Sequence, residues 1–204
     1  MLIVIDKIRD RVGAAAIVVL LIAGMVLGPN SFAGAAEGHL HFVLVAADVA
    51  PETDGVKPIL ILSGNGSFTS GWVKGGGMYT YADLATEVPK TILSTGTWKA
   101  TEVLKWTPSE GGATYGRVRP GVLDLRIDLM PEQGPVIKGA TLRINCNVGL
   151  AGIKNKDPDT PDAEETLAEG FWLTIPDTAN FGPTGSVGQF VPRDPILGIT
   201  EITL

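Results

Sequence analysis

The chain contains two histidines, His39 and His41, which stand two residues apart. In an extended segment, residues i and i+2 point to the same side, so both imidazoles can reach one metal ion. Cleavage of a leader after Ala36 would sharpen this candidate site, because the new terminus Glu37-Gly38-His39 offers amine, amide and imidazole nitrogens. That square-planar set suits Cu²⁺. The alternative interpretation is a pair of solvated histidines.

A second candidate metal site lies in the acidic segment around residues 155–165. Asp157, Asp159 and Asp162 carry closely spaced carboxylates, which are hard ligands of the kind that Ca²⁺ accepts. The EF-hand pattern is not met, because Pro161 stands at the position of the third ligand and the sixth position is not glycine. A solvated acidic loop is the alternative interpretation.

Three further residues could carry chemistry. Asn65 begins an N-x-S sequon in a glycine-rich stretch, which we interpret as a turn that could accept a glycan. Cys146 is the only cysteine and alternates with Leu142 and Ile144, which predicts a buried core residue and excludes an internal disulfide. Glu102 shares the parity of apolar neighbours, which indicates either a perturbed carboxylate or a β-bulge.

Motifs of common enzymes are absent from the sequence. It has no G-x-S-x-G, H-E-x-x-H, P-loop or C-x-x-C pattern, and no nucleophile–base pair stands out. We therefore assign no catalytic residue, and an enzyme acting in the mouth of a barrel is the least favoured hypothesis.

The elements that must position these residues are short and extended. The chain is 45% hydrophobic and 19% charged, and its 26 glycines and 14 prolines favour many turns. Residues 122–129 and 141–148 alternate apolar and polar side chains, which predicts an antiparallel pair of strands with one face in a core. The predicted inward residues are Leu123, Leu125, Ile127, Leu129, Leu142, Ile144, Cys146 and Val148.

Eight further segments have the composition of strands bounded by turn residues: 40–45, 58–62, 66–73, 78–82, 97–106, 114–119, 171–175 and 198–204. Their spacing predicts an all-β, antiparallel fold. We expect a two-sheet β-sandwich, with a β-barrel as the alternative.

Residues 1–35 have the pattern of a secretory signal peptide, expected as a helix before the β-domain. A basic start precedes an uncharged apolar run over 12–27, and Ala33-Gly34-Ala35 fits a cleavage site. The run is shorter than the roughly 20 residues of a typical membrane span. We expect one secreted β-domain over 36–204, with an acidic loop at about 154–169, and no integral membrane segment after cleavage; a retained anchor is the alternative.

Charge and export restrict the function. A net charge of −6 argues against nucleic acid as a partner. The first hypothesis is a non-enzymatic extracellular or cell-surface subunit that self-associates as a homo-oligomer, matrix or filament, with residues 37–48 exchanged as a strand. The alternative is a secreted module that binds a metal or a carbohydrate, the latter through Trp72, Trp98, Trp106, Trp172, Tyr79 and Tyr81.

Overall fold

The computed structural model describes residues 39–49, 55–83, 91–110, 114–148, 153–160, 166–176, 189–192 and 198–204. All of them belong to the unit Ala35–Leu204, and the chain's other unit is Met1–Gly34. The predicted signal peptide and Asp162 lie outside the described residues. Within the described ranges, no helix has the length and hydrophobicity needed to span a membrane.

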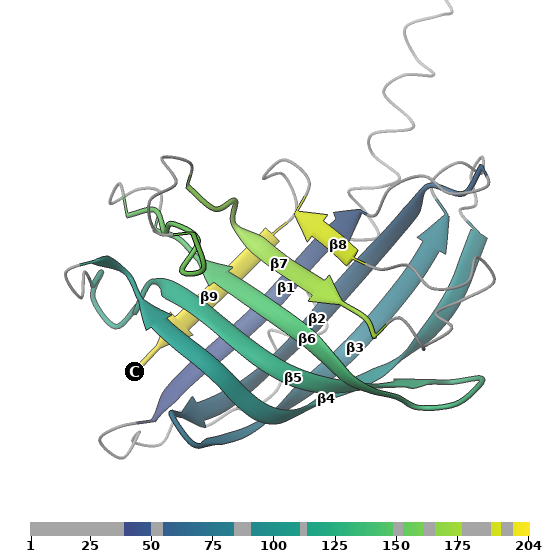
Figure 1. Ribbon diagram of the computed structural model, residues 1–204, viewed down its shortest axis with the longest axis horizontal. Helices are drawn as coiled ribbons and strands as arrows, with labels where there is room; N and C mark the ends of the chain where they lie inside the picture. Colours follow the sequence, from purple (N-terminus) through teal and green to yellow (C-terminus); the bar gives the residue numbers. More distant parts are fainter. Residues whose placement is uncertain are drawn as a thin grey trace, which may run out of the picture. The chain divides into compact units, whose positions relative to one another are not determined.

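In the described ranges, nine antiparallel strands form a single sheet. Its order is β2-β3-β4-β5-β6-β7-β8-β1-β9, and β1 also pairs with β2, so the sheet nearly closes into a barrel (Figure 1). The strands are β1 (Leu40–Val49), β2 (Pro58–Thr69), β3 (Trp72–Asp83), β4 (Thr91–Pro108), β5 (Gly121–Pro131), β6 (Ile137–Cys146), β7 (Gly170–Thr174), β8 (Gln189–Pro192) and β9 (Gly198–Thr203).

The all-β, antiparallel prediction is confirmed, and the arrangement is consistent with the barrel alternative, because the described strands belong to one sheet and not to two. Two of the predicted strands differ from those in the structure. The segment 66–73 contains the turn at Ser70 and Gly71 that joins β2 to β3. The segment 114–119 forms a turn, in which Val118 makes isolated bridges to Tyr115 and to Thr203.

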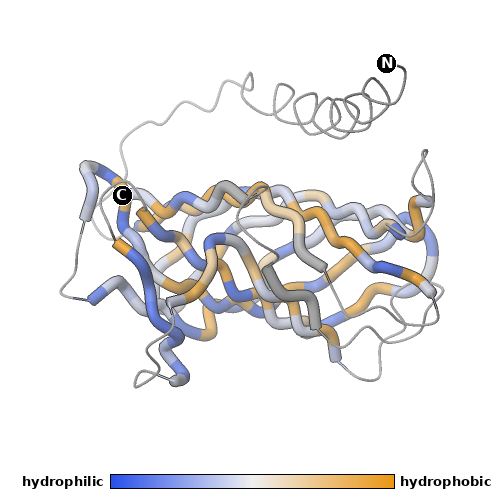
Figure 2. Tube along the Cα trace, turned by 90° about the horizontal axis from the view of Figure 1, so that it is seen from above, coloured by the Kyte–Doolittle hydropathy of each residue, from blue (hydrophilic) through white to orange (hydrophobic). Residues whose placement is uncertain are grey.

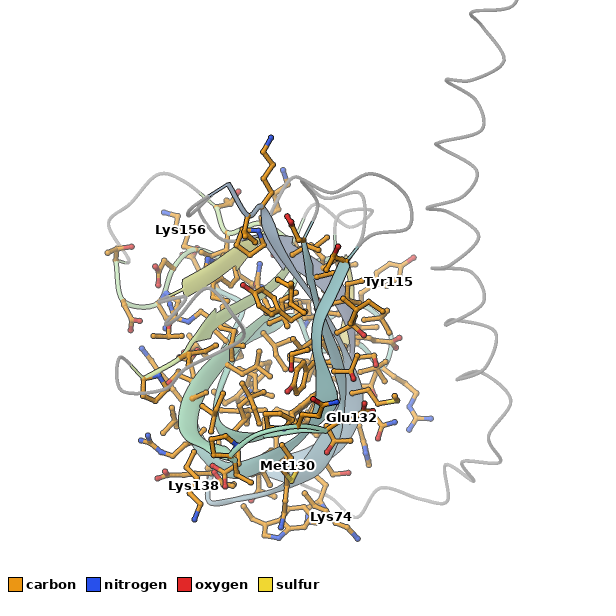
Figure 3. All side chains as sticks on the ribbon, turned by 90° about the vertical axis from the view of Figure 1, so that its right-hand side faces the viewer. Lys74, Tyr115, Met130, Glu132, Lys138 and Lys156 are labelled. Carbon is orange, nitrogen blue, oxygen red and sulfur yellow. The ribbon has the colours of Figure 1, made fainter. Side chains whose placement is uncertain are left out.

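The core fills the inside of this barrel. Seven of the eight predicted inward residues of β5 and β6 are at most 1% exposed, whereas Val148 is half-buried just after β6. Hydrophobic and hydrophilic residues alternate along the strands (Figure 2). Viewed from the side of the molecule, carbon-rich side chains crowd the interior, while Lys74 and Lys138 point away from it (Figure 3). Burial of one face of each strand therefore drives the fold.

Glycines in the middle of β2 and β3 make room for aromatic rings. A Cβ atom on Gly66 would lie 2.6 Å from Cε1 of Phe42 and 2.7 Å from the Cα of Gly75. A Cβ on Gly64 would lie 2.4 Å from Cζ2 of Trp98. Phe42 and Trp98 are almost fully buried and stack on each other with ring centroids 6.3 Å apart. Missing side chains on β2 and β3 thus leave room for large side chains from β1 and β4, the strands that flank this pair.

Both edges of β1 are paired within the chain. One edge pairs with β2 over its whole length, and the other pairs with β9 and then with β8. Phe42 and Leu44 of this strand belong to the core. This pairing within one chain is the alternative to the exchange of β1 between subunits. Strand exchange stays a prediction.

Gly66→Ala should destabilise the domain by about 1–3 kcal/mol, because the added methyl group overpacks the Phe42 ring and the facing backbone. Gly71→Ala, in the β2–β3 turn with no atom within 4 Å of a new Cβ, is the matched control and should change stability little. Urea unfolding curves would measure both. Equal stability of the two variants would contradict the packing role of Gly66.

Candidate groove on the outer face

Two β-bulges in β4 determine which of its residues face outward. The register with β5 shifts between Ala100 and Glu102 and again between Val103 and Lys105. The second shift leaves Leu104 exposed beside Lys105 on the outer face. Bulges of this kind redirect side chains and are common next to functional sites.

A row of four side chains crosses the outer face from β4 to β7. Lys105 is opposite Asp124, Asp124 is opposite Arg143, and Arg143 is opposite Trp172. The residues that flank Asp124 and Arg143 along their strands are fully buried in the core. Since side chains alternate along a strand, the row must lie on the outside of the barrel.

The Arg143 guanidinium joins this row to the acidic loop. It binds Asp124 through two hydrogen bonds, Nε to Oδ1 at 2.7 Å and Nη2 to Oδ2 at 3.0 Å. Nη1 donates to Oδ1 of Asp157 at 3.0 Å, and Nη2 also donates to Oδ2 of Asp159. Lys105 Nζ lies 3.2 Å from Oδ1 of Asp159. Two cations and three carboxylates therefore form one network.

The network stabilises the charged forms of two of its members. Hydrogen bonding to Asp124 raises the pKa of Arg143 further above its ordinary value. Hydrogen bonds from Arg143 and then from Lys105 lower the pKa of Asp159. By formal charge, two cations and three carboxylates give the cluster one net negative charge.

A groove of about 540 Å³ opens over this network. Apolar surface comes from Leu104, Leu167 and Trp172, and hydroxyl groups come from Thr141 and Thr174. The charged lining residues are those of the network: Lys105, Asp124, Arg143, Asp157 and Asp159. An aromatic wall next to a few fixed polar groups is typical of small-molecule sites.

A buried set of asparagines fastens the acidic loop to the barrel. The side chain of Asn155 donates to Oδ1 of Asn145 at 2.6 Å and to the carbonyl of Cys146 at 2.7 Å, and Ser109 donates to its Oδ1. Asn147 accepts from the Asn155 backbone N–H at 2.8 Å. Asn145 and Asn147 then donate to carbonyls of residues 167 and 168. The loop position that forms one wall of the groove is therefore set by side chains.

Glu169 completes this attachment. Its carboxylate accepts the Asn147 N–H at 2.7 Å, the Thr200 N–H at 3.2 Å and the Thr200 hydroxyl. Burial raises the pKa of Glu169 above its ordinary value, and the three hydrogen bonds only partly oppose this. Glu169 thus connects β6, β9 and the segment before β7 at the cost of a buried charge.

The two histidines of the predicted metal site lie outside the groove, His39 just before β1 and His41 within it. His39 packs against Trp72 with ring centroids 5.6 Å apart, and Nδ1 of His41 lies 2.9 Å from the hydroxyl oxygen of Ser67. In the part of the chain that the structure describes, no group of three or more His, Cys, Asp or Glu residues could hold a metal ion. Metal binding by His39 and His41, and copper binding by a terminus at Glu37-Gly38-His39, stay predictions.

Two of the three predicted calcium ligands, Asp157 and Asp159, line the groove. Arg143 binds both carboxylates, and Lys105 contacts Asp159. Asp162 lies outside the described residues. The acidic loop is thus bound to the sheet over this stretch, and calcium binding stays a prediction.

Asn65 lies in the middle of β2 and not in a turn, which corrects our interpretation. It faces Val43 of β1 and Gly76 of β3, and its side chain is exposed. The neighbouring glycines had indicated a turn, but they serve the packing of Phe42 and Trp98 inside the barrel. Glycosylation at this outward position stays a prediction.

Cys146 and Glu102 follow their simpler interpretations. Cys146 is buried, and burial raises its pKa to about 12, which keeps the thiol protonated and unreactive. Glu102 falls at the first bulge of β4 and forms an exposed ion pair with Arg126 at 2.9 Å.

The sequence did not identify Arg143, Asp124 and Lys105 as a cluster. Asp124 and Arg143 were expected to face water, yet the loop covers them, and Asn145 beside them is fully buried for the same reason. Opposite charges on the outward faces of two neighbouring predicted strands were the available signal. The aromatic residues proposed for carbohydrate binding lie in different places. Trp98, Tyr79 and Tyr81 are in the core, while Trp172 lines the groove.

Comparison of the chain with protein-family models, with curated proteins and with solved structures gives no match.

Arg143→Met should lower the free energy of unfolding by about 3 kcal/mol, because it leaves the shielded Asp124 carboxylate without its partner. The double variant Arg143→Met/Asp124→Leu should recover most of this loss, since it also removes the unpaired charge. Chemical denaturation of the two variants would measure the difference. A double variant no more stable than the single one would contradict this account of the pair.

Glu169→Gln should change how stability depends on pH. A carboxyl group whose pKa is raised by folding stabilises the native state below the pKa of an unfolded glutamate, and this contribution is lost as pH rises through the folded pKa. The stability of the wild type relative to Glu169→Gln should therefore fall as the pH rises above about 4, the pKa of an unfolded glutamate. Glu201→Gln, at an exposed position of β9, controls for the loss of one charge. An opposite slope in urea titrations would contradict the assignment.

Proposed function

We propose that the protein is an exported, non-enzymatic binding protein and that the groove on β4–β7 binds a carbohydrate. The observation that carries this proposal is the position of Trp172 directly across from Arg143, with both residues lining one groove. Export rests on the signal-peptide pattern of residues 1–35.

The half-buried Trp172 offers the apolar surface that the site needs. A sugar ring presents C–H groups on its faces, so an indole held by a strand can pack against it without a new loop conformation. Leu104 and Leu167 add further apolar surface to the lining of the groove. A rigid sheet supports the aromatic group and reduces the entropy lost on binding.

The polar part of the groove matches a ligand rich in hydroxyl groups. Asp157 and Asp159 offer carboxylate oxygens, while Thr141 and Thr174 lie opposite each other with their hydroxyls in the lining. Hydrogen bonds to ionised groups are stronger than those between neutral groups. Every charge is already held by a partner, so the polar groups keep their positions before a ligand arrives.

Self-association is the competing function. Its strand-exchange form needs a strand that is available to another subunit, whereas both edges of β1 are paired within the chain. That pairing is our reason for placing ligand binding first. Homo-oligomer or filament formation remains a prediction that sedimentation would test.

Trp172→Ala should weaken the binding of a glycan identified on a glycan array by about tenfold or more, as expected for a tryptophan at the centre of a binding site. Trp72→Ala is the matched control, since Trp72 is 45% exposed and lies outside the groove. Isothermal titration calorimetry would give both affinities. Unchanged binding by Trp172→Ala, or no bound glycan for the wild type, would contradict the proposal.

A further inference from the structure

We propose that the groove is specific for acidic carbohydrates and that the carboxylate of the ligand replaces Asp159 on Arg143 and Lys105. This inference rests on the proposed function and names its class of ligand. In the unbound protein, Asp159 holds the position of the ligand.

The two cations already converge on one carboxylate. Oδ1 of Asp159 is 3.2 Å from Lys105 Nζ, and Oδ2 accepts a hydrogen bond from Arg143 Nη2. One carboxylate thus bridges two basic side chains that belong to different strands, β4 and β6. A planar anion with two oxygens is the group that fits such a bridge.

Of the three carboxylates on Arg143, Asp159 is the one that can leave. Its side chain is 58% exposed, against 9% for Asp124 and 31% for Asp157. Asp124 binds Arg143 through two hydrogen bonds within the sheet, and Asp157 also accepts the backbone N–H of Asp159 at 3.0 Å. Rotation of the Asp159 side chain into water therefore leaves the loop attached and exposes no buried unpaired charge.

The charge balance selects the class of ligand. With Asp159 turned away, Arg143 and Lys105 face only the carboxylates of Asp124 and Asp157. A carboxylate on the ligand restores the charge that the network has in the unbound protein. A neutral group in the same place would leave Lys105 without its ion-pair partner and would gain less from the two cations.

The position of Trp172 determines how far a sugar ring packed on its indole would lie from the guanidinium of Arg143. Its strand position is directly opposite Arg143, and opposite residues in an antiparallel pair have Cβ atoms roughly 5 Å apart. A sugar ring packed on the indole would place a carboxylate substituent on its edge within reach of the guanidinium. Uronic acids have this arrangement of ring and carboxylate.

The test compares tetragalacturonic acid with its methyl ester, which has the same rings without the charges. Asp159→Asn removes the internal competitor, so the affinity for the free acid should rise by at least about fivefold. The affinity for the ester should change by less than about twofold, since the ester cannot replace a carboxylate on the two cations. Calorimetry with wild type and variant would measure all four affinities.

Glu102→Gln is the matched control. It removes the same charge from an exposed ion pair of the outer face, the pair with Arg126, which lies outside the groove. Its affinity for the free acid should stay within about twofold of the wild type, because long-range charge effects are screened. Thermal melts should show both variants folded, as exposed ion pairs contribute little to stability.

Each outcome separates the two proposals. Weaker binding of the free acid to Asp159→Asn, or equal affinity for acid and ester, overturns the exchange of carboxylates. If a neutral glycan binds in a Trp172-dependent way while the acid does not bind, the further inference fails and the proposed function stands. If Asp159→Asn strengthens acid binding but Trp172→Ala has no effect, the anion site stands and the carbohydrate site does not.

Discussion

The outer face of this barrel depends on the guanidinium of Arg143. It satisfies Asp124 within the sheet and holds Asp157 and Asp159 from the loop, so one side chain connects β5, β6 and the acidic segment. Without it, three carboxylates would face one another in a partly shielded place, which is electrostatically unfavourable. Arg143 therefore links the acidic loop to the sheet and brings Asp159 next to Lys105.

The inside and the outside of the barrel are coupled through the register of its strands. Glycines at the centres of β2 and β3 allow Phe42 and Trp98 to fill the interior. The second bulge of β4 leaves Leu104 and Lys105 exposed on the outer face, while Val103 packs against the core. The register of β4 therefore decides which of its residues line the groove.

The loop is attached in two ways that differ in character. On the side of Asn145, Asn147 and Asn155 the contacts are buried, directional hydrogen bonds, and burial of Glu169 raises its pKa. On the side of Asp159 the contacts are exposed ion pairs. Buried polar contacts fix a conformation, whereas exposed ion pairs exchange readily with other ligands. The proposed exchange of carboxylates therefore centres on Asp159, with the asparagines as the fixed support.

The sequence by itself determined the all-β class and the inward faces of β5 and β6. Period-two alternation is a local property of the sequence, and it shows directly which side chains of a strand are buried. It also brought Asp157 and Asp159 forward as candidates. Three things were decided by the tertiary structure alone. The loop buries Asn145 and shields Asp124 although their strand parity points outward; Gly64 and Gly66 belong to a strand and not to a turn; and Arg143 stands where a metal ion was expected. Each of these features depends on which distant segment of the chain lies next to the residue. Strand register, bulges and loop docking determine that neighbour, and they leave no periodic signal in a single sequence.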